Sequence, residues 1–348
     1  MKIFCFFVEP SSYTIDLATN VYEKKGIDYC FIKSISYAES SSFTDKYILQ
    51  KKSILSRCIF IYKIFKSYDY IIINGYNNLP FLLTFFLNII SINKKYIAID
   101  SDTQLNIPRN FIKRYVKQLY LNIVFRNKKV LGYAGGSKNH KDLFRYYGMS
   151  DDRIFLIPMM VNNAKFYCDK KFPKIFTFLY VGRLVKHKGV ENLIKKFNLV
   201  FSKNNAILRI VGSGNQEDYL KSKYQSDRII FAGKKVGKDL ISEYHNASCF
   251  VLPSLFEPWG LVVNEALSSS LPVISFSNVG ASYDLISNKN TGLLAQNIDD
   301  FADKMMLMFS KKSMLLEFSR NATFFMKNKW NYSFYNYCLE QSLNSVKS

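Results

Sequence analysis

The sequence predicts an α/β protein with two doubly wound domains that face a central cleft. Short apolar runs alternate with segments of helical spacing along the chain, which is the pattern of parallel sheets covered by helices on both faces. The alternation is interrupted once, near residues 158–174, where Pro158 and Pro173 flank a stretch with few periodic apolar residues. With 348 residues, the chain is also long enough for two separate cores.

The first half of the chain supplies apolar runs that are bounded by turn residues. The run at 2–8 stops at Glu9 and Pro10, so it is too short for a secretory signal and suits a buried strand. The longest apolar stretch, 79–92, contains Pro80 and Asn88 and falls short of a membrane span. The candidate strands are 2–8, 29–32, 70–73, 96–99 and 129–133.

The second half continues the alternation of strands and helices. Its candidate strands are 176–181, 206–211, 228–231, 249–252 and 272–275, and the helical segments between them are 190–203, 216–223, 238–246 and 261–269. We therefore expect a first domain over 1–160, a linker over 161–174 and a second domain over 175–325. A C-terminal helix over 326–348 is expected to pack back on the first domain.

The composition favours an anionic partner. The chain carries 48 basic and 27 acidic residues, for a net charge of +21, and the excess is spread over both halves. Such a chain attracts nucleotide phosphates, nucleic acid or an acidic membrane surface, but no nucleic-acid recognition module is visible. The six cysteines and three histidines are not clustered, so we expect no metal site and free thiols in a reducing compartment.

Two glycine-containing loops follow the first two strands of the second half. Gly182 and Gly189 permit close backbone approach, and Arg183 and Lys188 between them are spaced to reach a diphosphate. A basic surface loop is the alternative interpretation. The next turn contains Gly212 and Gly214 and would line the same cleft, although a G-x-G turn alone is weak.

The most specific segment runs from Glu257 to Glu265. Pro258 and Gly260 predict a helix that begins near Gly260, and the free amides at its start would face an anion. Glu257 then precedes the helix and Glu265 lies about a turn and a half inside it. One carboxylate could approach a sugar while the other accepts hydrogen bonds from ribose hydroxyls. The alternative is a capping Glu257 and a solvated Glu265.

These residues resemble the family-4 retaining glycosyltransferases, which have the GT-B fold of two Rossmann-like domains and include bacterial surface-polysaccharide enzymes. Glu257 and Glu265 match the E-x7-E pattern, and the loop from Gly182 to Gly189 matches a G-R…K-G pattern. Further matches are 212–214, 231–234, 252–254, 278–280 and 290–294. The resemblance is strong from about residue 130 to 296 and faint before that.

The resemblance implies a role for each matching residue. Arg183 and Lys188 would neutralise the departing diphosphate, Glu265 would bind the ribose, and Glu257 would contact the donor sugar. Gly260 and Leu261 would offer amides to the phosphate. The remaining donor-binding residues would be Gly182, Gly212, Gly214 and Lys234. The nucleotide-sugar is then a substrate, with no metal and no cofactor required.

The first half contains a literal D-x-D, formed by Asp100 and Asp102 after the strand at 96–99. In another glycosyltransferase fold this pattern would hold a metal. Its position favours the acceptor side of the cleft, with Asp102 or Asp100 near the reacting centre; an N-cap or turn aspartate is the alternative. Residues 9–13 lack the glycine-rich loop that is frequent in the family, so the acceptor site is expected to be divergent.

The segment 109–129 contains seven basic residues, no acidic residue and interleaved apolar ones. A basic amphipathic helix of this kind can lie on anionic lipid. The alternative is an ordinary helix with one face in the core.

The sequence thus predicts a retaining glycosyltransferase that moves a hexose-type sugar from a UDP- or GDP-sugar to a glycan or to an undecaprenyl-linked or other lipid acceptor. Surface polysaccharide or lipopolysaccharide biosynthesis in the cytoplasm, with peripheral contact to the inner face of the plasma membrane, is the expected setting. A nucleotide-sugar epimerase of the same fold is the alternative, but it needs its own acid and base, and histidines are scarce. A nucleic-acid-binding protein and an inactive GT-B domain are less favoured.

Overall fold

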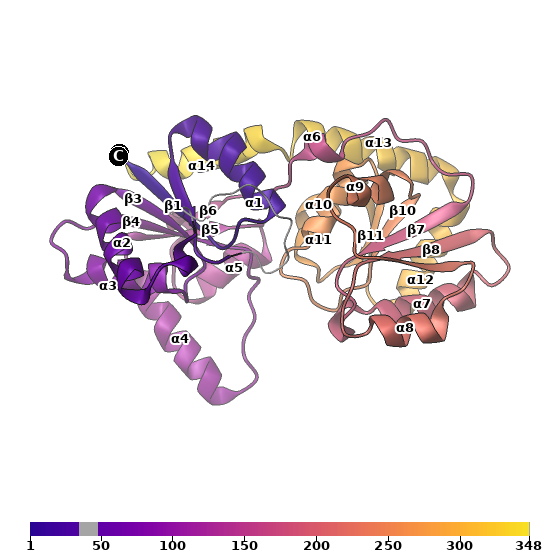
Figure 1. The fold of residues 1–348 in the computed structure, drawn as a ribbon, viewed down its shortest axis with the longest axis horizontal. Coiled ribbons are helices and arrows are strands. Elements are labelled where there is room, and N and C mark those ends of the chain that lie inside the picture. Colours follow the sequence, from indigo (N-terminus) through magenta and orange to yellow (C-terminus); the bar gives the residue numbers. More distant parts are fainter. Residues whose placement is uncertain (35–47, 348) are drawn as a thin grey trace. The chain divides into compact units, whose positions relative to one another are not determined.

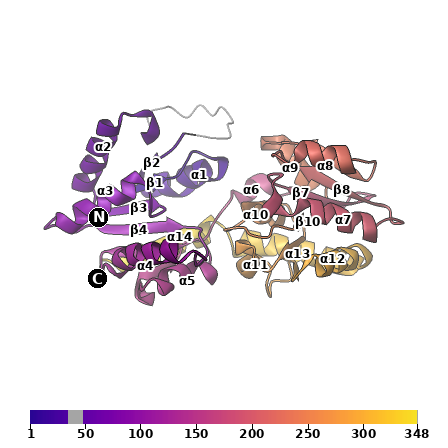
Figure 2. The same ribbon diagram turned by 90° about the horizontal axis from the view of Figure 1, so that it is seen from below.

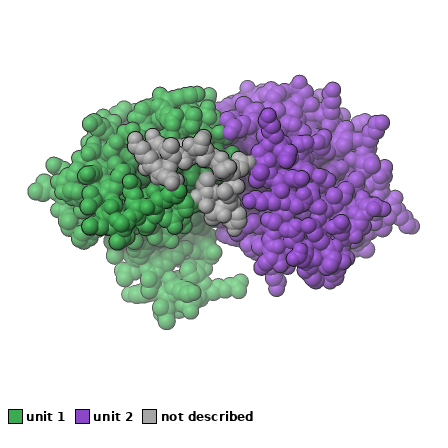
Figure 3. All heavy atoms as spheres, viewed as in Figure 1, with its two compact units in different colours: residues 1–160, 332–348 green, residues 161–331 purple. Residues whose placement is uncertain are grey.

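The computed structural model describes residues 1–34 and 48–347 and divides the chain into two compact units. Unit 1 comprises Met1–Met160 and Tyr332–Ser348, and unit 2 comprises Val161–Asn331 (Figure 3). Each unit contains a six-stranded sheet in which every pairing is parallel. The predicted α/β class with two doubly wound domains is confirmed.

Unit 1 has the strand order β2-β1-β3-β4-β5-β6 (Figure 1). Its strands are β1(Ile3–Phe7), β2(Asp28–Phe31), β3(Tyr70–Asn74), β4(Tyr96–Ser101), β5(Val130–Ala134) and β6(Ile154–Leu156). Its α-helices are α1(Ser12–Leu17), α2(Ile54–Ser67), α3(Leu79–Ile90), α4(Phe111–Arg126), α5(Asn139–Tyr146) and α14(Tyr332–Asn344). The π-helical turn η1(Ala18–Tyr22) follows α1 directly.

The alternation of side chains along β3 assigns the helices of unit 1 to two layers. Ile71 and Ile73 belong to a core that they share with buried residues of α2, α3, α4 and α5. Tyr70 points to the other face, because successive strand residues alternate. There its hydroxyl lies 3.1 Å from Ser342 Oγ of α14, and the Tyr22 hydroxyl of η1 lies 2.9 Å from that of Tyr335.

Unit 2 has the strand order β12-β11-β10-β7-β8-β9. Its strands are β7(Phe176–Val181), β8(Ala206–Val211), β9(Ile229–Gly233), β10(Cys249–Leu252), β11(Val273–Phe276) and β12(Gly292–Ala295). Its helices are α6(Asn163–Phe166), α7(Val190–Val200), α8(Glu217–Tyr224), α9(Gly237–His245), α10(Leu261–Ser268), α11(Gly280–Leu285), α12(Ile298–Ser310) and α13(Lys312–Asn328) (Figure 2).

The strand order reverses direction once in each sheet, and these points determine where ligands can bind. In unit 1 the reversal lies between the neighbours β1 and β3, and in unit 2 it lies between β7 and β10. The loops after two such strands run to opposite sides and leave a crevice at the carboxyl edge of the sheet. Polar residues after β1, β3, β7 and β10 therefore lie where a ligand can bind.

The segment 161–174 packs as part of unit 2. It contains the short helix α6, and Lys170 Nζ donates to the carbonyl oxygens of Tyr244 at 2.8 Å and His245 at 2.9 Å. Burial in that place lowers the pKa of Lys170 to about 8. Within residues 1–34 and 48–347, no helix is both long and apolar enough to cross a membrane.

Candidate functional site

A buried ion pair occupies the reversal point of unit 2. Lys188 ends the 3-10 turn η6(Lys186–Lys188) after β7, and its Nζ contacts the Glu257 carboxylate in the loop after β10. Only 10% of the Lys188 side chain and 15% of the Glu257 side chain are exposed. The two predicted residues come from strands that are neighbours in the sheet although 69 positions separate them in the chain. Each charge compensates the other where water is largely excluded.

Glycines allow the loops around this pair to approach one another closely. A Cβ on Gly189, which has φ +71, would lie 2.3 Å from the carbonyl oxygen of Pro253 in the loop after β10. A Cβ on Gly212, which has φ +139, would lie 1.9 Å from the carbonyl oxygen of Gly182, and one on Gly214 would lie 2.3 Å from that of Leu184. Only glycine, which has no Cβ, allows the loops after β7, β8 and β10 to approach one another this closely.

The segment from Glu257 to Glu265 adopts the predicted loop and helix. Gly260 has φ +96 and precedes the first residue of α10, Leu261. Trp259 is buried and its indole N–H donates to Asn264 Oδ1 at 2.8 Å, which anchors the turn to the helix. The start of α10 therefore lies next to Glu257, and its first amides are available to an anion in this crevice.

Glu265 lies inside α10 and is only partly exposed. The Tyr244 hydroxyl donates a hydrogen bond of 2.6 Å to Glu265 Oε2. Burial raises the pKa of Glu265 to about 7, although the hydrogen bond from Tyr244 opposes this rise. Burial disfavours the ionised form of this carboxyl group, and hydrogen bonds from further hydroxyl groups would stabilise that form.

The remaining predicted cations lie at the same edge of the sheet and are exposed. Arg183 follows β7, and its carbonyl oxygen accepts a 3.0 Å hydrogen bond from the buried Tyr180 hydroxyl. Lys234 follows β9, the strand next to β8. The predicted donor-binding residues thus follow strands of one sheet at its carboxyl edge, and Lys188 and Glu257 form an ion pair there.

Unit 1 has a cavity of its own at its reversal point, with a volume of about 360 Å³. Its lining includes the carboxylates of Glu9, Asp100 and Asp102 and contains no Lys or Arg among the described residues. The Asn74 side chain at the end of β3 donates to Asp100. Burial and the neighbouring Asp102 raise the pKa of Asp100 to about 7.

The structure distinguishes the two aspartates of the D-x-D pattern. Asp102, the residue predicted to be catalytic, is exposed at the cavity mouth, whereas Asp100 is the more enclosed. Tyr13, Asn74 and Tyr335 also line the cavity and were not predicted. Asn74 could have been found because it ends a strand, but Tyr335 reaches the cavity only through the return of α14 to unit 1.

Metal-binding side chains do not gather in the described ranges of the chain. No cluster of three or more His, Cys, Asp or Glu side chains there could hold a metal ion, and the six cysteines are free thiols. The aspartate pair of unit 1 is therefore not accompanied by a third ligand of these types in the part of the chain that the structure describes.

Comparisons with known proteins agree with this geometry. Residues 169–324, which include every predicted donor-binding residue, match the family described as glycosyl transferases group 1. An uncharacterized glycosyltransferase of Methanocaldococcus jannaschii is 37% identical over 119 residues, which are 33% of this chain and 30% of that protein. The capsular polysaccharide biosynthesis glycosyltransferase CapM of Staphylococcus aureus is 30% identical over 207 residues, 56% of this chain and 53% of that one.

Solved structures extend the likeness to nearly the whole chain. Sucrose-phosphate synthase of Thermosynechococcus elongatus superposes with a TM-score of 0.75 at 17% identity, covering 99% of both chains. HepE of Anabaena in complex with UDP gives a TM-score of 0.74 at 15% identity, covering 99% of this chain and 100% of that one.

The chain therefore has the GT-B fold. The match to the glycosyl transferases group 1 family lies within residues 169–324 of unit 2. The chain spans only about a third to a half of the length of the curated relatives described above.

Proposed function

We propose that the chain is a retaining glycosyltransferase that transfers a hexose-type sugar from a UDP- or GDP-sugar held by unit 2. The observation that carries this proposal is the buried Lys188–Glu257 pair at the β7/β10 reversal point. A nucleotide diphosphate needs a fixed cation in that place, and a sugar needs a carboxylate beside it. The pair supplies both and lies within the residues that match the glycosyl transferases group 1 family.

In the proposed reaction, the residues of unit 2 at the donor site have separate roles. Lys188, Arg183 and the first amides of α10 stabilise the negative charge that develops on the diphosphate, so this step requires no metal ion. Glu265 accepts hydrogen bonds from the ribose hydroxyls. The bond from the anomeric carbon to the diphosphate oxygen breaks, and a bond to the acceptor oxygen forms on the same face. The proton of the acceptor hydroxyl passes to the departing diphosphate.

The acceptor is proposed to bind with a sugar end in the cavity of unit 1. Glu9, Asp100 and Asp102 offer carboxylate oxygens that accept hydrogen bonds from hydroxyl groups. Because the described lining holds no Lys or Arg, an anionic group at this end would be repelled. A neutral glycan, free or linked to a lipid, suits the cavity.

The setting is proposed to be surface polysaccharide or lipopolysaccharide biosynthesis in the cytoplasm. It is supported by the likeness to CapM and by a lipopolysaccharide outer core galactosyltransferase, WaaB, which superposes with a TM-score of 0.70. WaaB is 16% identical to this chain, and the match covers 99% of this chain and 100% of that one. CapM, WaaB and the sucrose-phosphate synthase are named as transferases or synthases, which favours a transferase over the epimerase alternative.

Nucleotide binding by the purified chain tests the donor site. We expect either UDP or GDP to bind without added metal and to raise the melting temperature, because it binds only the folded state. Lys188→Met should abolish this shift. A protein that remains unaffected by every nucleoside diphosphate, or a variant that binds as well as the parent, would contradict the proposal.

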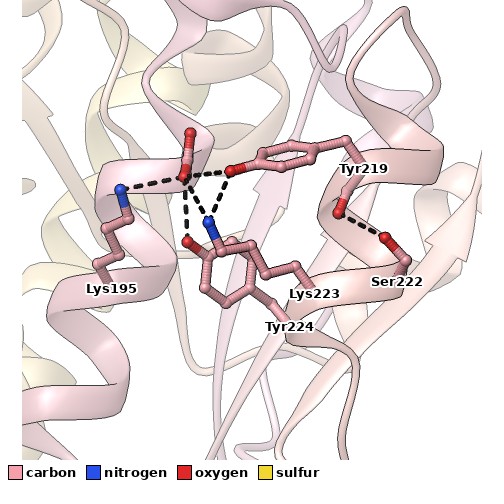
Figure 4. A network of polar contacts seen from close by, with 6 residues as sticks. Lys195, Tyr219, Ser222, Lys223 and Tyr224 are labelled. Carbon is pink, nitrogen blue, oxygen red and sulfur yellow. Dashed lines mark hydrogen bonds and ion pairs between the residues drawn. The ribbon is translucent and has the colours of Figure 1, made fainter.

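Lys195→Met is the matched control. Lys195 lies on α7, close in sequence to Lys188, but its Nζ is 3.0 Å from Glu191 in a network with Tyr219, Lys223 and Tyr224 (Figure 4). The same change of residue type there removes an exposed ion pair only. We expect the nucleotide to bind this variant as it binds the parent chain.

A further inference from the structure

A buried hydroxyl group without a hydrogen-bond partner lies in the loop after β10. It belongs to Ser254, which is fully buried and whose Oγ makes no hydrogen bond within the described ranges of the chain. Burial of an unpaired hydroxyl costs free energy, so each such group in a folded chain needs an explanation. Of the four described side-chain oxygens in this condition, Ser254 Oγ is the one that follows a strand at the carboxyl edge of a sheet.

Backbone contacts on either side of Ser254 hold its loop against the turn after β7. The Leu255 amide donates a 2.9 Å hydrogen bond to the carbonyl oxygen of His187. An added Cβ on Gly189 would lie 2.3 Å from the carbonyl oxygen of Pro253. The loop therefore runs antiparallel to the turn, and Ser254 lies opposite the residue between the two contacts.

The residue opposite Ser254 is Lys188, and Glu257, the partner of Lys188, follows three positions after Ser254. The Lys188 ammonium group has three N–H donors and contacts the Glu257 carboxylate in the free chain. A diphosphate at this place would share that ammonium group with Glu257, because both anions need the same cation. Glu257 would then lose part of its compensation while it is still mostly buried.

Two neighbouring hydroxyl groups are candidates for a further hydrogen bond to Glu257. Burial and the Glu257 carboxylate raise the pKa of Tyr180, but the Tyr180 hydroxyl already donates to the Arg183 carbonyl oxygen at 3.0 Å. The Ser254 hydroxyl has no such bond in the described part of the chain. Because Ser254 is fully buried, a ligand in the crevice does not reach its hydroxyl, whereas a neighbouring side chain that shifts can do so.

We propose that Ser254 is a positioning residue whose hydroxyl donates a hydrogen bond to the Glu257 carboxylate when a nucleoside diphosphate engages Lys188. The hydroxyl is then unpaired in the free chain and paired in the bound one, so it favours binding. The new bond keeps Glu257 charged and directed toward the donor sugar. This inference rests on the proposed function, because it requires a diphosphate at Lys188.

The variant Ser254→Ala tests the proposal through two measurements that should not change together. In the free chain, the melting temperature should be equal to that of the parent or higher, because an unpaired buried hydroxyl is removed. The affinity for UDP or GDP, measured by titration calorimetry with the one that binds the parent, should fall roughly tenfold. The reason is the loss of a hydrogen bond to a charged group. A purely structural side chain would not lower the affinity without lowering the stability.

The variant Thr84→Val is the matched control. Thr84, on α3 of unit 1, is also fully buried, and its Oγ1 likewise has no hydrogen-bond partner among the described residues. Valine has nearly the same shape, so the change removes the same kind of hydroxyl from the unit that lacks the donor loops. We expect a melting temperature equal to that of the parent or higher, and an unchanged nucleotide affinity.

The Glu257→Gln background separates a hydrogen bond to Glu257 from one to the ligand. This variant should still bind the diphosphate through Lys188, and Ser254→Ala should not weaken binding further there, because no carboxylate remains. An equal loss in both backgrounds would assign the hydroxyl to the ligand and overturn the proposal. A Ser254→Ala chain that is less stable when free, or that binds the nucleotide like the parent, would overturn it while leaving the proposed function intact. A parent chain that binds no nucleoside diphosphate would overturn both.

Discussion

At the scale of single residues, the two charges of the Lys188–Glu257 pair depend on each other for their stability. Both side chains are mostly buried, so either charge would be poorly hydrated without its partner. The ε-amino group and the carboxylate are therefore maintained in one geometry before any substrate is bound. This preorganisation is what a site must supply if it is to stabilise charge that appears only during the reaction.

Removal of one partner should cost more than removal of both. We expect Lys188→Met to lower the free energy of unfolding by roughly 3–5 kcal/mol, because the mostly buried Glu257 carboxylate would lose the cation that it contacts. The double variant Lys188→Met, Glu257→Gln should recover part of this loss, because it removes the buried negative charge together with the positive one. Thermal unfolding of the single and double variants measures the coupling. Strictly additive losses would show that the two groups do not interact.

The raised pKa of Glu265 makes stability depend on pH. Its pKa is about 7 in the folded chain and about 4.3 in an unfolded one, so the folded state binds the proton more tightly. Protonated Glu265 therefore stabilises the folded state below the pKa of the unfolded chain, and this contribution is lost as the pH rises through the pKa of the folded chain. We expect Glu265→Gln to reduce the fall in melting temperature between about pH 5 and about pH 8.

The pKa of Asp100 is also raised to about 7, so Asp100 likewise makes the protein less stable as the pH rises. Part of the fall in melting temperature should therefore remain in Glu265→Gln. The combined variant Glu265→Gln, Asp100→Asn should be flatter still. Identical slopes in the parent and in all variants would contradict both assignments.

At the scale of elements, strands were predictable where apolar residues form a continuous run. The runs at 70–73 and 249–252 correspond to β3(Tyr70–Asn74) and β10(Cys249–Leu252). The edge strands β6(Ile154–Leu156) and β12(Gly292–Ala295) were not predicted. Each is short and pairs with a neighbouring strand on one side only. Its sequence therefore contains little of the continuous apolar run that is typical of a strand with both faces buried.

The residues of the candidate site were predictable from the sequence where they lie in loops that come directly after a predicted strand. Lys188 and Glu257 could be named from their loops, but their contact required the order of β7 and β10 in the sheet, which periodicity does not give. The segment 109–129 was predicted to be a basic amphipathic helix, and its second, exposed apolar face became visible only when Leu121 and Val124 were found buried on the other side.

The close approach of the loops after β7 and β8 makes a further prediction. We expect Gly212→Ala to destabilise the protein by roughly 2–4 kcal/mol and to weaken nucleotide binding, because its Cβ would collide with the Gly182 carbonyl oxygen. Gly233→Ala is the control, since Gly233 has φ +68 but nothing within 4 Å of the added Cβ. It should cost only about 1–2 kcal/mol of backbone strain. Equal melting temperatures for the two variants would exclude the steric explanation.

At the scale of the whole molecule, the chain passes between the two units twice, and both passages are anchored in unit 2. The Asn163 side chain, just after the first passage, donates to the carbonyl oxygens of Met326 and Trp330, each at 2.8 Å. Trp330, just before the second passage, stacks on Trp259 with ring centroids 5.8 Å apart. Trp259 lies between Glu257 and Gly260, so both passages pack next to the loop after β10.

Because of this connectivity, the two units should differ in their ability to fold when each is produced alone. Unit 2 is a continuous segment, whereas unit 1 needs α14 to cover one face of its sheet. Without α14, Tyr70 and Tyr133 lose the buried hydroxyl of Ser342, which lies within 3.1 Å of Tyr70 and 2.8 Å of Tyr133, and Tyr22 loses Tyr335. The loss of these hydrogen-bond partners and an uncovered apolar face both oppose folding.

We therefore expect a fragment of residues 161–331 to unfold cooperatively and to bind the same nucleoside diphosphate as the full chain. A fragment of residues 1–160 should aggregate or lack a cooperative transition, and joining residues 332–347 to it through a flexible linker should restore one. Calorimetry of the three fragments measures this. If residues 1–160 alone melted like the linked form, α14 would be only an accessory to unit 1. The buried hydroxyl cluster would then contribute nothing to holding the returning chain in place.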